Sequence, residues 1–282
     1  MEPLVSREPY QIRSQNLAGQ HSASKIGSFT QSDDKRIYFL QEVPQNLKLN
    51  DCRYEIEKFH DSTYLKTSSF ILNYKKKQTG VYFPNIGMRT SIRQKKRIPK
   101  QELHGTMVLI SGNLYIHEYK IPKYMMTSFI SGGTEIGMRS TCWVIIKDWD
   151  TGKSFAVISV HGNNNNTKRE LLINSLFEEG SKFNENDMGV IIAGDFNEFP
   201  HKMSKFMNHK FFFTPSDPKK MTHISNVRKF SGSRIDWVFL SHNLKNNTNE
   251  KVSGLNQDKK IMNNCMKKKN LDHSVLQVTF NF

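Results

Sequence analysis

The chain has 282 residues, 37% of them hydrophobic, and no glycine/serine-rich or proline-rich linker divides it, which favours one domain over two. It has no run of 18 apolar residues and no Sec-type signal sequence, which excludes a membrane-spanning helix and predicts a protein that is cytoplasmic or exported by another route. The 41 lysines and arginines against 26 acidic residues give a formal net charge of +15, which favours a polyanionic partner, either nucleic acid or an anionic membrane surface.

The three cysteines, Cys52, Cys142 and Cys265, are odd in number and lie far apart, without a Cys-x-x-Cys pair. This pattern predicts neither a disulfide framework nor a thiolate zinc site. Cys142 lies in the apolar run TCWVII, so we expect it to be a small buried residue.

The predicted elements are mostly short strands between polar turns. In chain order the strands are YQIRSQN (10–16), KRIYFLQEV (35–43), two about a Ser-Gly-Asn turn in GTMVLISGNLYIHEYKI (105–121), a hairpin about Asp150-Thr151-Gly152 in RSTCWVIIKDWDTGKSFAVISVHG (139–162), GVIIAGDFN (189–197), RIDWVFLS (234–241) and SVLQVTFNF (274–282). Residues 166–183 have apolar side chains at helical spacing and form the predicted helix, with Gly180 as its candidate cap. Many strands with few helices predict an α/β or α+β sandwich with sheet at its centre.

Two polar intervals, 75–104 and 243–270, separate these elements. The second has little apolar periodicity and is predicted to be a surface loop, partly disordered, and residues 1–9 are predicted to be flexible. The chain has no internal repeat, so we expect residues 1–282 to form a single domain.

Polar side chains follow the apolar runs of several strands or open the next one. These side chains are Asn16, Glu42, His161, Asn164, Asp195, Asn197, Asp236, Asp272 and His273. Polar groups brought together at strand ends form a site on a rigid scaffold. Oxygen ligands without thiolates favour Mg²⁺ or Mn²⁺, and a histidine beside a carboxylate suits proton transfer or the stabilisation of a charged transition state.

Each of these residues alone also has a plain structural explanation. Asp195 and Asn197 fit an ordinary turn, because both residue types favour turns. His161 fits a hydrogen-bonded core or surface histidine, and Glu42 fits a cap for a following helix. The combination is more specific, because six such features follow one another in a definite order.

That order resembles the endonuclease/exonuclease/phosphatase superfamily, which has the fold of pancreatic deoxyribonuclease. The resemblance rests on QNLAG (15–19), LQE (40–42), SVHGNN (159–164), GDFN (194–197), RIDWVF (234–239) and DHSVL (272–276), of which GDFN and Asp-His are the most specific. The superfamily usually has serine before Asp-His, where this chain has Leu271, and residues 44–135 match none of its motifs.

The spelling of SQNLAGQHSAS and VHGNNNN is closest to the nuclease subunit of cytolethal distending toxins. This likeness implies a toxin or effector that acts in a host cell. The superfamily as a whole implies a four-layer α/β sandwich, in which two mostly antiparallel central sheets are flanked by helices and the site lies at the upper edge of the sheets.

The resemblance also implies a metal site and a histidine–carboxylate pair. Asn16 and Glu42 hold one Mg²⁺, for which Mn²⁺ is a substitute, and Asp272 is a further carboxylate ligand. Asp236 fixes the tautomer of His273, which contacts the phosphate or helps to activate water.

The remaining roles that the resemblance implies concern the attacking water and the phosphate. Asp195 orients or deprotonates the water, and Asn197 donates a hydrogen bond to the phosphate. His161 faces the phosphate as a donor or proton carrier, assisted by Asn164. Arg139 is a weaker candidate for a phosphate clamp.

Substrate choice is not fixed by this fold, which hosts DNA cleavage, RNA cleavage, inositol-lipid dephosphorylation and sphingomyelin hydrolysis. The net charge and the motif spellings favour a Mg²⁺-dependent endonuclease that cleaves double-stranded DNA with little sequence preference. A phosphoinositide phosphatase on an anionic membrane is the first alternative, and a catalytically inactive polyanion-binding module is the second. Lys267, Lys268 and Lys269, a few residues before Asp272, are predicted either to bind flanking phosphates or to form a solvated loop.

Overall fold

The computed structural model describes residues 8–17, 34–44, 54–62, 67–89, 104–120, 123–130, 134–162, 166–207, 209–225, 231–244, 248–253 and 273–282. The strands of the first half are β1 (Tyr10–Asn16), β2 (Arg36–Pro44), β3 (Tyr54–Ser62), β4 (Thr67–Tyr74), β5 (Lys77–Pro84), β6 (Ile86–Arg89), β7 (His104–Ile110), β8 (Leu114–Tyr119), β9 (Lys123–Ile130) and β10 (Thr134–Thr141). Those of the second half are β11 (Trp143–Asp148), β12 (Ser154–His161), β13 (Gly189–Asp195), β14 (Phe212–Phe213), β15 (His223–Ser225), β16 (Ser231–Ser233), β17 (Asp236–Ser241), β18 (Asn249–Ser253) and β19 (Val275–Phe280). The described helices are α2 (Asn166–Asn184), α3 (Pro200–Met207) and the 3-10 helix η1 (His242–Leu244).

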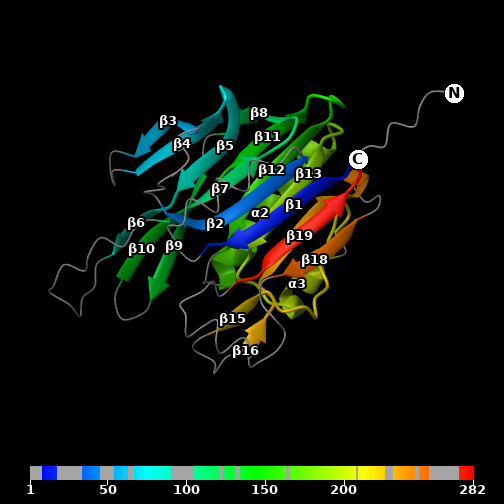
Figure 1. Cartoon of the computed structure of the whole chain (residues 1–282). Coiled ribbons are helices and arrows are strands. Elements are labelled where there is room, and N and C mark those ends of the chain that lie inside the picture. The colour runs from blue at the N-terminus through cyan, green and yellow to red at the C-terminus, as the bar shows by residue number, and fades with distance from the viewer. Residues whose placement is uncertain are drawn as a thin grey trace.

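Two large sheets form the body of the protein (Figure 1). The eight-stranded sheet has the order β18-β19-β1-β2-β7-β5-β4-β3, and the six-stranded sheet has the order β14-β17-β13-β12-β11-β8. All neighbouring strands in them are antiparallel except β1–β2 and β12–β13. The predicted sandwich of two mostly antiparallel sheets is confirmed. Because parallel strands end at the same edge of a sheet, each sheet has one strand pair whose carboxyl ends lie together.

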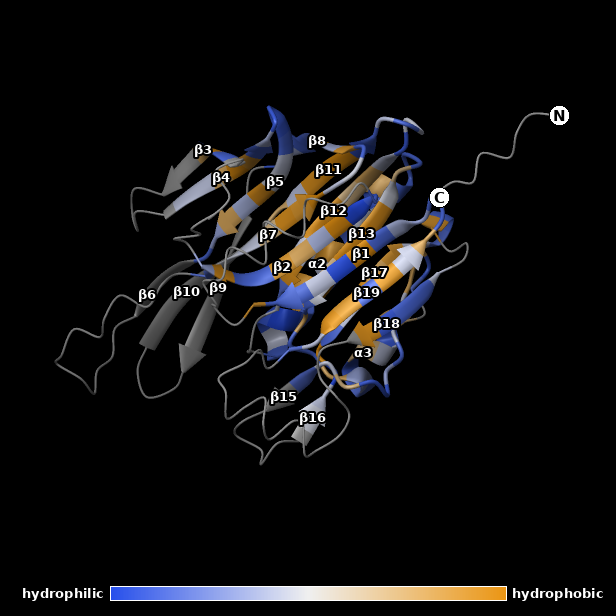
Figure 2. Cartoon of the chain, in the orientation of Figure 1, coloured by the Kyte–Doolittle hydropathy of each residue, from blue (hydrophilic) through white to orange (hydrophobic). Residues whose placement is uncertain are grey.

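The core lies between the two sheets, and the central strands are apolar on both faces. In β2, Ile37 and Phe39 pack between the sheets, whereas Tyr38 and Leu40 pack in a separate cluster on the opposite face. Figure 2 shows the hydrophobic residues concentrated along the central strands of both sheets. Strands buried on both faces have continuous apolar runs, which is why IYFL and VIIA do not alternate with polar residues.

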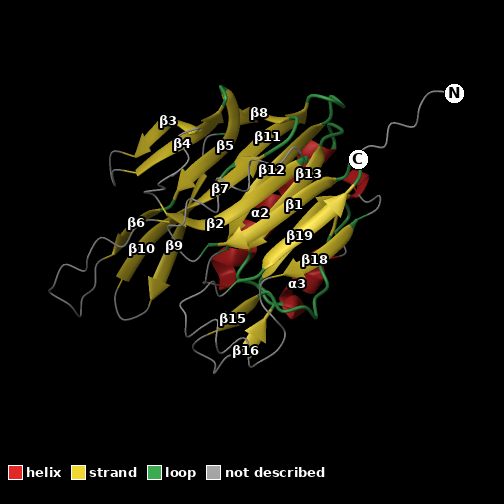
Figure 3. Ribbon diagram, in the orientation of Figure 1, coloured by secondary structure: helices red, strands yellow, loops and turns green. Residues whose placement is uncertain are grey.

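Helices α2 and α3 cover the outer face of the six-stranded sheet (Figure 3). Leu172, Leu176 and Phe177 of α2 pack there against Val190 and Ile192 of β13. This layer fixes the carboxyl ends of β12 and β13, because α2 follows the first of these strands and α3 follows the second.

Three details of the predicted elements differ from the structure. Gly180 does not cap α2, which continues to Asn184, and it is buried where a Cβ would lie 2.9 Å from the ring of Phe212, so the missing side chain lets the helix approach the sheet. The polar interval 75–104 contains β5 and β6. Residues 249–253 of the predicted loop 243–270 form the edge strand β18, which pairs with β19.

Cys142 is a buried free thiol, as predicted, and burial raises its pKa to about 12. Cys52 and Cys265 lie outside the described residues. Within the part of the chain that the structure describes, no helix is both long enough and apolar enough to cross a membrane.

Candidate active site

Polar side chains from both sheets meet at one edge of the sandwich. The strand registers place Asn16 beside Gln41, His161 beside Asp195, and Asp195 beside Asp236. The hydrogen bond from Asn16 Nδ2 to Asp195 Oδ2, 3.1 Å long, joins the eight-stranded sheet to the six-stranded sheet at this edge. The two parallel strand pairs are therefore aligned so that their carboxyl ends face each other.

Glu42 reaches this edge from a β-bulge. The register between β2 and β7 shifts between Leu40 and Val43, and Glu42 has a φ of 51° there. Asn16 Nδ2 donates to Glu42 Oε1 at 3.3 Å. The side chain of Glu42 is 31% exposed, whereas that of Asp195 is 3% exposed, so the site opens to solvent on the side of Glu42.

His161 is a buried imidazole that faces two carboxylates. Its Nε2 lies 3.6 Å from Glu42 Oε1 and 3.8 Å from Asp195 Oδ2. Both distances exceed that of a hydrogen bond. An imidazole in this position can offset negative charge when it is protonated and can exchange a proton with a molecule bound between the three side chains.

His273 and Asp236 form a buried imidazole–carboxylate pair. The Nδ1 atom of His273 lies 3.0 and 3.1 Å from the two carboxylate oxygens of Asp236. Its Nε2 lies 3.8 Å from Asp195 Oδ2. A proton on Nδ1 is held by the carboxylate, and Nε2 is thereby directed to the middle of the site.

Strand β15 and Thr222, the residue directly before it, support this pair from one side. Thr222 Oγ1 accepts hydrogen bonds from the backbone N–H groups of Ile235 and Asp236, each 3.1 Å long. The ring of His223 lies 4.7 Å from that of His273, centroid to centroid, and the two residues form a β-bridge. Thr222 thus fixes where β17 begins, and His223 of β15 packs against one side of His273.

The loop after β13 is held in an unusual conformation. Asn197 has a φ of 52°, and its backbone N–H donates to Asp195 Oδ1 at 2.8 Å. Its Nδ2 donates to the carbonyl oxygen of Gly162 at 3.1 Å, which ties this loop to the end of β12. A Cβ at Gly162 would lie 2.0 Å from the carbonyl oxygen of Phe196, so only glycine fits there. The carboxamide has two N–H groups, so one remains for the predicted donation to a phosphate.

A buried ion pair supports the same loop. Arg169 of α2 donates through Nε to Glu198 Oε2 at 2.8 Å, and both residues are 4% exposed. Trp237 Nε1 donates to the carbonyl oxygen of Glu198 at 2.9 Å. Arg169 and Trp237 therefore fix the residue that directly follows Asn197.

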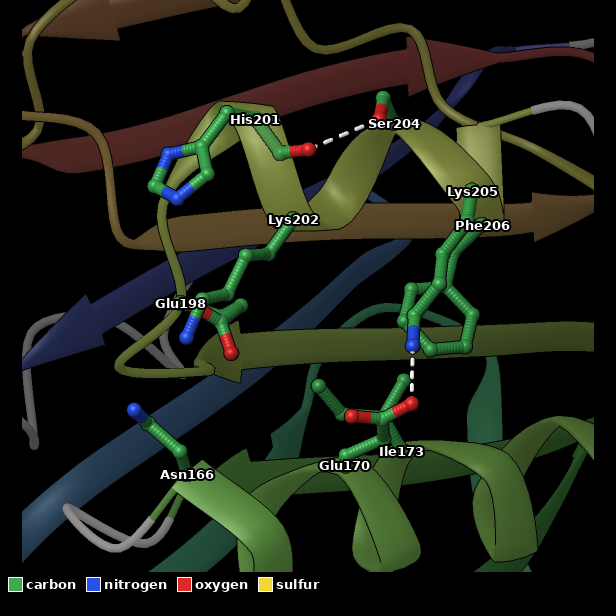
Figure 4. Close-up of a pocket in the computed structure, with 9 residues that line it drawn as sticks. All are labelled: Asn166, Glu170, Ile173, Glu198, His201, Lys202, Ser204, Lys205 and Phe206. Carbon is green, nitrogen blue, oxygen red and sulfur yellow. Dashed lines mark hydrogen bonds and ion pairs between the residues drawn. The ribbon is translucent and has the colours of Figure 1, made fainter.

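A cavity of about 290 Å³ lies beside this ion pair, between α2 and α3 (Figure 4). Its polar lining includes Glu198, Lys202 of α3, and the ion pair between Lys205 of α3 and Glu170 of α2. None of the strand-end side chains lines it, so it is a neighbour of the site and not the site itself.

We call Asn16, Glu42, His161, Asp195, Asn197, Asp236 and His273 the strand-end cluster, which the structure brings together. The structure does not describe the side chains of the other predicted site residues. Asn164, Asp272 and Lys267, Lys268 and Lys269 lie outside the described residues. Arg139 lies in β10, and the structure does not describe its side chain.

Four residues at or near the site were not predicted. They are His104, His223, Arg169 and Glu198. Glu198 directly follows GDFN, and this adjacency was the available signal for it. His104 and His223 belong to no sequence motif. Long-range strand pairing brings them to the site.

No protein-family model matches the sequence, and a search of curated proteins also finds no match. Solved structures match along nearly the whole chain. An endonuclease/exonuclease/phosphatase from Bacteroides vulgatus has a TM-score of 0.57 at 12% identity, covering 97% of this chain and 99% of that one. D. rerio TDP2 complexed with a single-strand DNA product has a TM-score of 0.55 at 15% identity, covering 97% and 99%. A mannosyl-6-phosphatase from Bacteroides thetaiotaomicron has a TM-score of 0.52 at 15% identity, covering 97% and 100%. The chain has the endonuclease/exonuclease/phosphatase fold.

The endonuclease/exonuclease/phosphatase family typically uses a divalent metal, and the donor set at this edge fits one. Glu42 and Asp195 present carboxylate oxygens, the type of ligand that hard divalent cations prefer. Asn16 faces both carboxylates with Nδ2, so its Oδ1 would join this set only after a rotation of the carboxamide. Ligand atoms of Asp195, Asp236 and His273 also lie within 4.8 Å of one another and form a second candidate position. The similarity to toxin nuclease subunits stays a prediction, since it rests on motif spelling alone.

Proposed function

We propose that this protein is a divalent-metal-dependent phosphodiesterase that cleaves DNA internally with little sequence preference. The supporting observation is the strand-end cluster, in which three carboxylates, two amides and two buried histidines from both sheets face one another. An ordinary turn would explain polar side chains at only one strand end. A histidine with a purely structural role would need only one hydrogen-bond partner. Hydrolysis of a phosphoester requires a proton acceptor, a proton donor and positive charge around one phosphate.

The attacking water is positioned by Asp195. Its Oδ1 is fixed by the backbone N–H of Asn197, so Oδ2 is the atom that faces the site. The water oxygen bonds to phosphorus, and a water proton passes to this carboxylate. His273 in its protonated form, held in place through Nδ1 by Asp236, donates its Nε2–H to a non-bridging phosphate oxygen.

Residues on the opposite side of the cluster act on the leaving oxygen and the phosphate. As the bond between phosphorus and the leaving oxygen breaks, protonated His161 supplies a proton to that oxygen. Asn197 donates its second amide N–H to the phosphate. Glu42 and the side-chain oxygen of Asn16 would hold a divalent cation, which would supply further positive charge around the phosphate.

We place the cation at Glu42, because this is the candidate position of the two that has solvent access. His273 Nδ1 and Asp236 are within hydrogen-bond distance of each other, which suits a proton-holding pair better than two ligands of one ion. Asp272 is a further ligand in this proposal.

DNA is the proposed substrate because its backbone is a line of phosphates and the chain has a net charge of +15. D. rerio TDP2, which has the same fold, is complexed with a single-strand DNA product, which supports a nucleic acid here as well. The B. thetaiotaomicron mannosyl-6-phosphatase shows that the fold also serves phosphomonoesters. A phosphoinositide phosphatase is therefore the alternative that the test must separate.

The test offers purified protein two substrates in parallel, supercoiled plasmid and phosphoinositide-containing vesicles, each with Mg²⁺ or with excess chelator. We expect nicking of the plasmid in Mg²⁺ and none in chelator. Glu42→Gln should lower the rate and raise the Mg²⁺ concentration needed for half-maximal activity, because it removes a charged ligand.

The matched control is Glu118→Gln, which changes an exposed glutamate of the edge strand β8 and should behave as wild type. Phosphate release from the vesicles with the plasmid left supercoiled would support the phosphatase alternative. Full turnover in chelator would refute the metal.

A further inference from the structure

One histidine of the eight-stranded sheet faces the proposed metal position from outside the strand-end cluster. His104 Nδ1 lies 3.9 Å from Glu42 Oε2. The other carboxylate oxygen, Oε1, faces Asn16 and His161. The carboxylate of Glu42 therefore lies between two imidazoles, one toward each of its oxygens.

Strand pairing fixes this arrangement. Past the bulge that contains Glu42, β2 and β7 pair again through Val43 and Gly105 and through Pro44 and His104. The carbonyl oxygen of His104 accepts a hydrogen bond from the backbone N–H of Asn85, 3.2 Å long. The backbone of His104 is held on both sides, so its side chain is presented to Glu42 by the sheet.

The separation of the two side chains suits a shared cation better than a direct contact. At 3.9 Å the nitrogen and oxygen are too far apart for a hydrogen bond. Two ligands that each lie about 2.0–2.2 Å from one metal ion are at most about 4.4 Å apart. The side chains of His104 and Glu42 are 32% and 31% exposed, which leaves solvent access for a hydrated ion.

We propose that His104 is a ligand of the divalent cation that Glu42 binds. This inference rests on the metal site of the proposed function and goes further, because it adds a nitrogen to a set of oxygen ligands. Imidazole favours transition metals such as Co²⁺ over Mg²⁺, which prefers oxygen. The protein should therefore bind Co²⁺ more tightly than an all-oxygen site would.

The experiment measures ion binding without any substrate. Co²⁺ and Mg²⁺ are titrated separately into metal-free protein by calorimetry, for wild type, His104→Gln and the control His117→Gln. His117 is an exposed histidine on β8, away from Glu42. We expect His104→Gln to weaken Co²⁺ binding by at least about 10-fold, since losing even an outer partner of a ligand has that effect. Mg²⁺ binding should change by less than about threefold.

A spectroscopic measurement tests coordination directly. Pulsed EPR of bound Mn²⁺ should show coupling to an imidazole nitrogen in wild type and in His117→Gln, and a weaker or absent coupling in His104→Gln. His161→Gln separates the two imidazoles that face Glu42, because the nitrogen coupling of His104 should persist in that variant.

Several outcomes would overturn the assignment. Equal weakening of Co²⁺ and Mg²⁺ would mean a general electrostatic effect, and unchanged binding of both ions would mean that His104 is no ligand. A third outcome is that the wild-type protein binds the ion, loses this binding in Glu42→Gln, and hydrolyses no phosphoester. This outcome would refute the proposed function and leave the ligand assignment intact. Absence of any ion binding would refute both.

Discussion

Strands β1 and β2 begin in one polar cluster and end in another. At their starts, Tyr10 donates to Asp148 Oδ2 at 2.5 Å, and Lys35 lies 2.9 Å from Asp148 and 2.9 Å from Asp150. Thr151 Oγ1 also donates to Asp148, at 3.0 Å. We call these five residues the Tyr10–Asp148 cluster. It joins the eight-stranded sheet to the six-stranded sheet, as the strand-end cluster does at the other end.

The two clusters differ in how their charges are matched. In the Tyr10–Asp148 cluster the buried carboxylate has a cation and two hydroxyl donors at hydrogen-bond distance. Burial alone would raise the pKa of Asp148, but hydrogen bonds from Tyr10 and Lys35 hold it below its ordinary value. In the strand-end cluster the contacts of His161 with Glu42 and Asp195 are 3.6 and 3.8 Å. The buried carboxylate of the first cluster is matched by its own contacts, whereas in the second His161 faces two carboxylates beyond hydrogen-bond distance.

The largest effect should come from the histidines of the strand-end cluster. We expect His161→Ala and His273→Ala each to lower turnover by at least about 100-fold, because each removes a proton-transfer or charge-stabilising group. The measurement is plasmid nicking at saturating Mg²⁺, together with thermal unfolding. An early unfolding transition with normal turnover per folded molecule would show that the histidine is structural, as the Tyr10–Asp148 cluster is.

Removing the cation of the Tyr10–Asp148 cluster should lower stability and leave turnover per folded molecule unchanged. Lys35→Met leaves Asp148 buried without its cation and should lower the free energy of unfolding by about 2 kcal/mol. This is less than the roughly 3–5 kcal/mol of a fully buried pair, because Lys35 retains some exposure. Chemical denaturation measures the loss. A fall in turnover per folded molecule would contradict the proposed separation of the two ends.

The ion pair between Arg169 and Glu198, which supports the loop after β13, lies between the catalytic and the purely structural case. Arg169→Lys keeps the charge but loses the planar donors that hold Glu198 and Asn166 together. We expect turnover to fall by about 10-fold with little change in KM, because a small displacement of Asp195 and Asn197 misaligns the water. The control is Lys205→Gln, which breaks the exposed pair with Glu170 and should leave turnover unchanged. A loss confined to stability would make Arg169 part of the scaffold only.

The sequence predicted the strand ends better than their surroundings. Asp195, Asp236 and His161 follow or open apolar runs, and parallel and antiparallel pairing brings such ends to one edge. His104 could not be found this way, because its place depends on a bulge in a strand some 60 residues earlier. Gly180 was mistaken for a cap because a glycine inside a helix and one after it look alike in sequence, and only the packing against Phe212 separates them.

The smallest effect should come from a single hydroxyl of the Tyr10–Asp148 cluster. Tyr10→Phe removes one donor to Asp148 and should lower the free energy of unfolding by about 1.5 kcal/mol at pH 7, the lower end of the range for a hydrogen bond to a charged group. Because the pKa of Asp148 is depressed in the folded protein, the stability it contributes is present above its ordinary value near 3.9. That contribution is lost as the pH falls through the depressed pKa. The difference between wild type and Tyr10→Phe should therefore shrink below about pH 3.9, as denaturant unfolding at a series of pH values would show. Since Tyr10 lies at the far end of β1 from Asn16, turnover at pH 7 should match wild type. A difference that stays constant with pH would mean that Tyr10 contributes only packing, and that the other contacts of Asp148, among them Lys35 and Thr151, hold its charge.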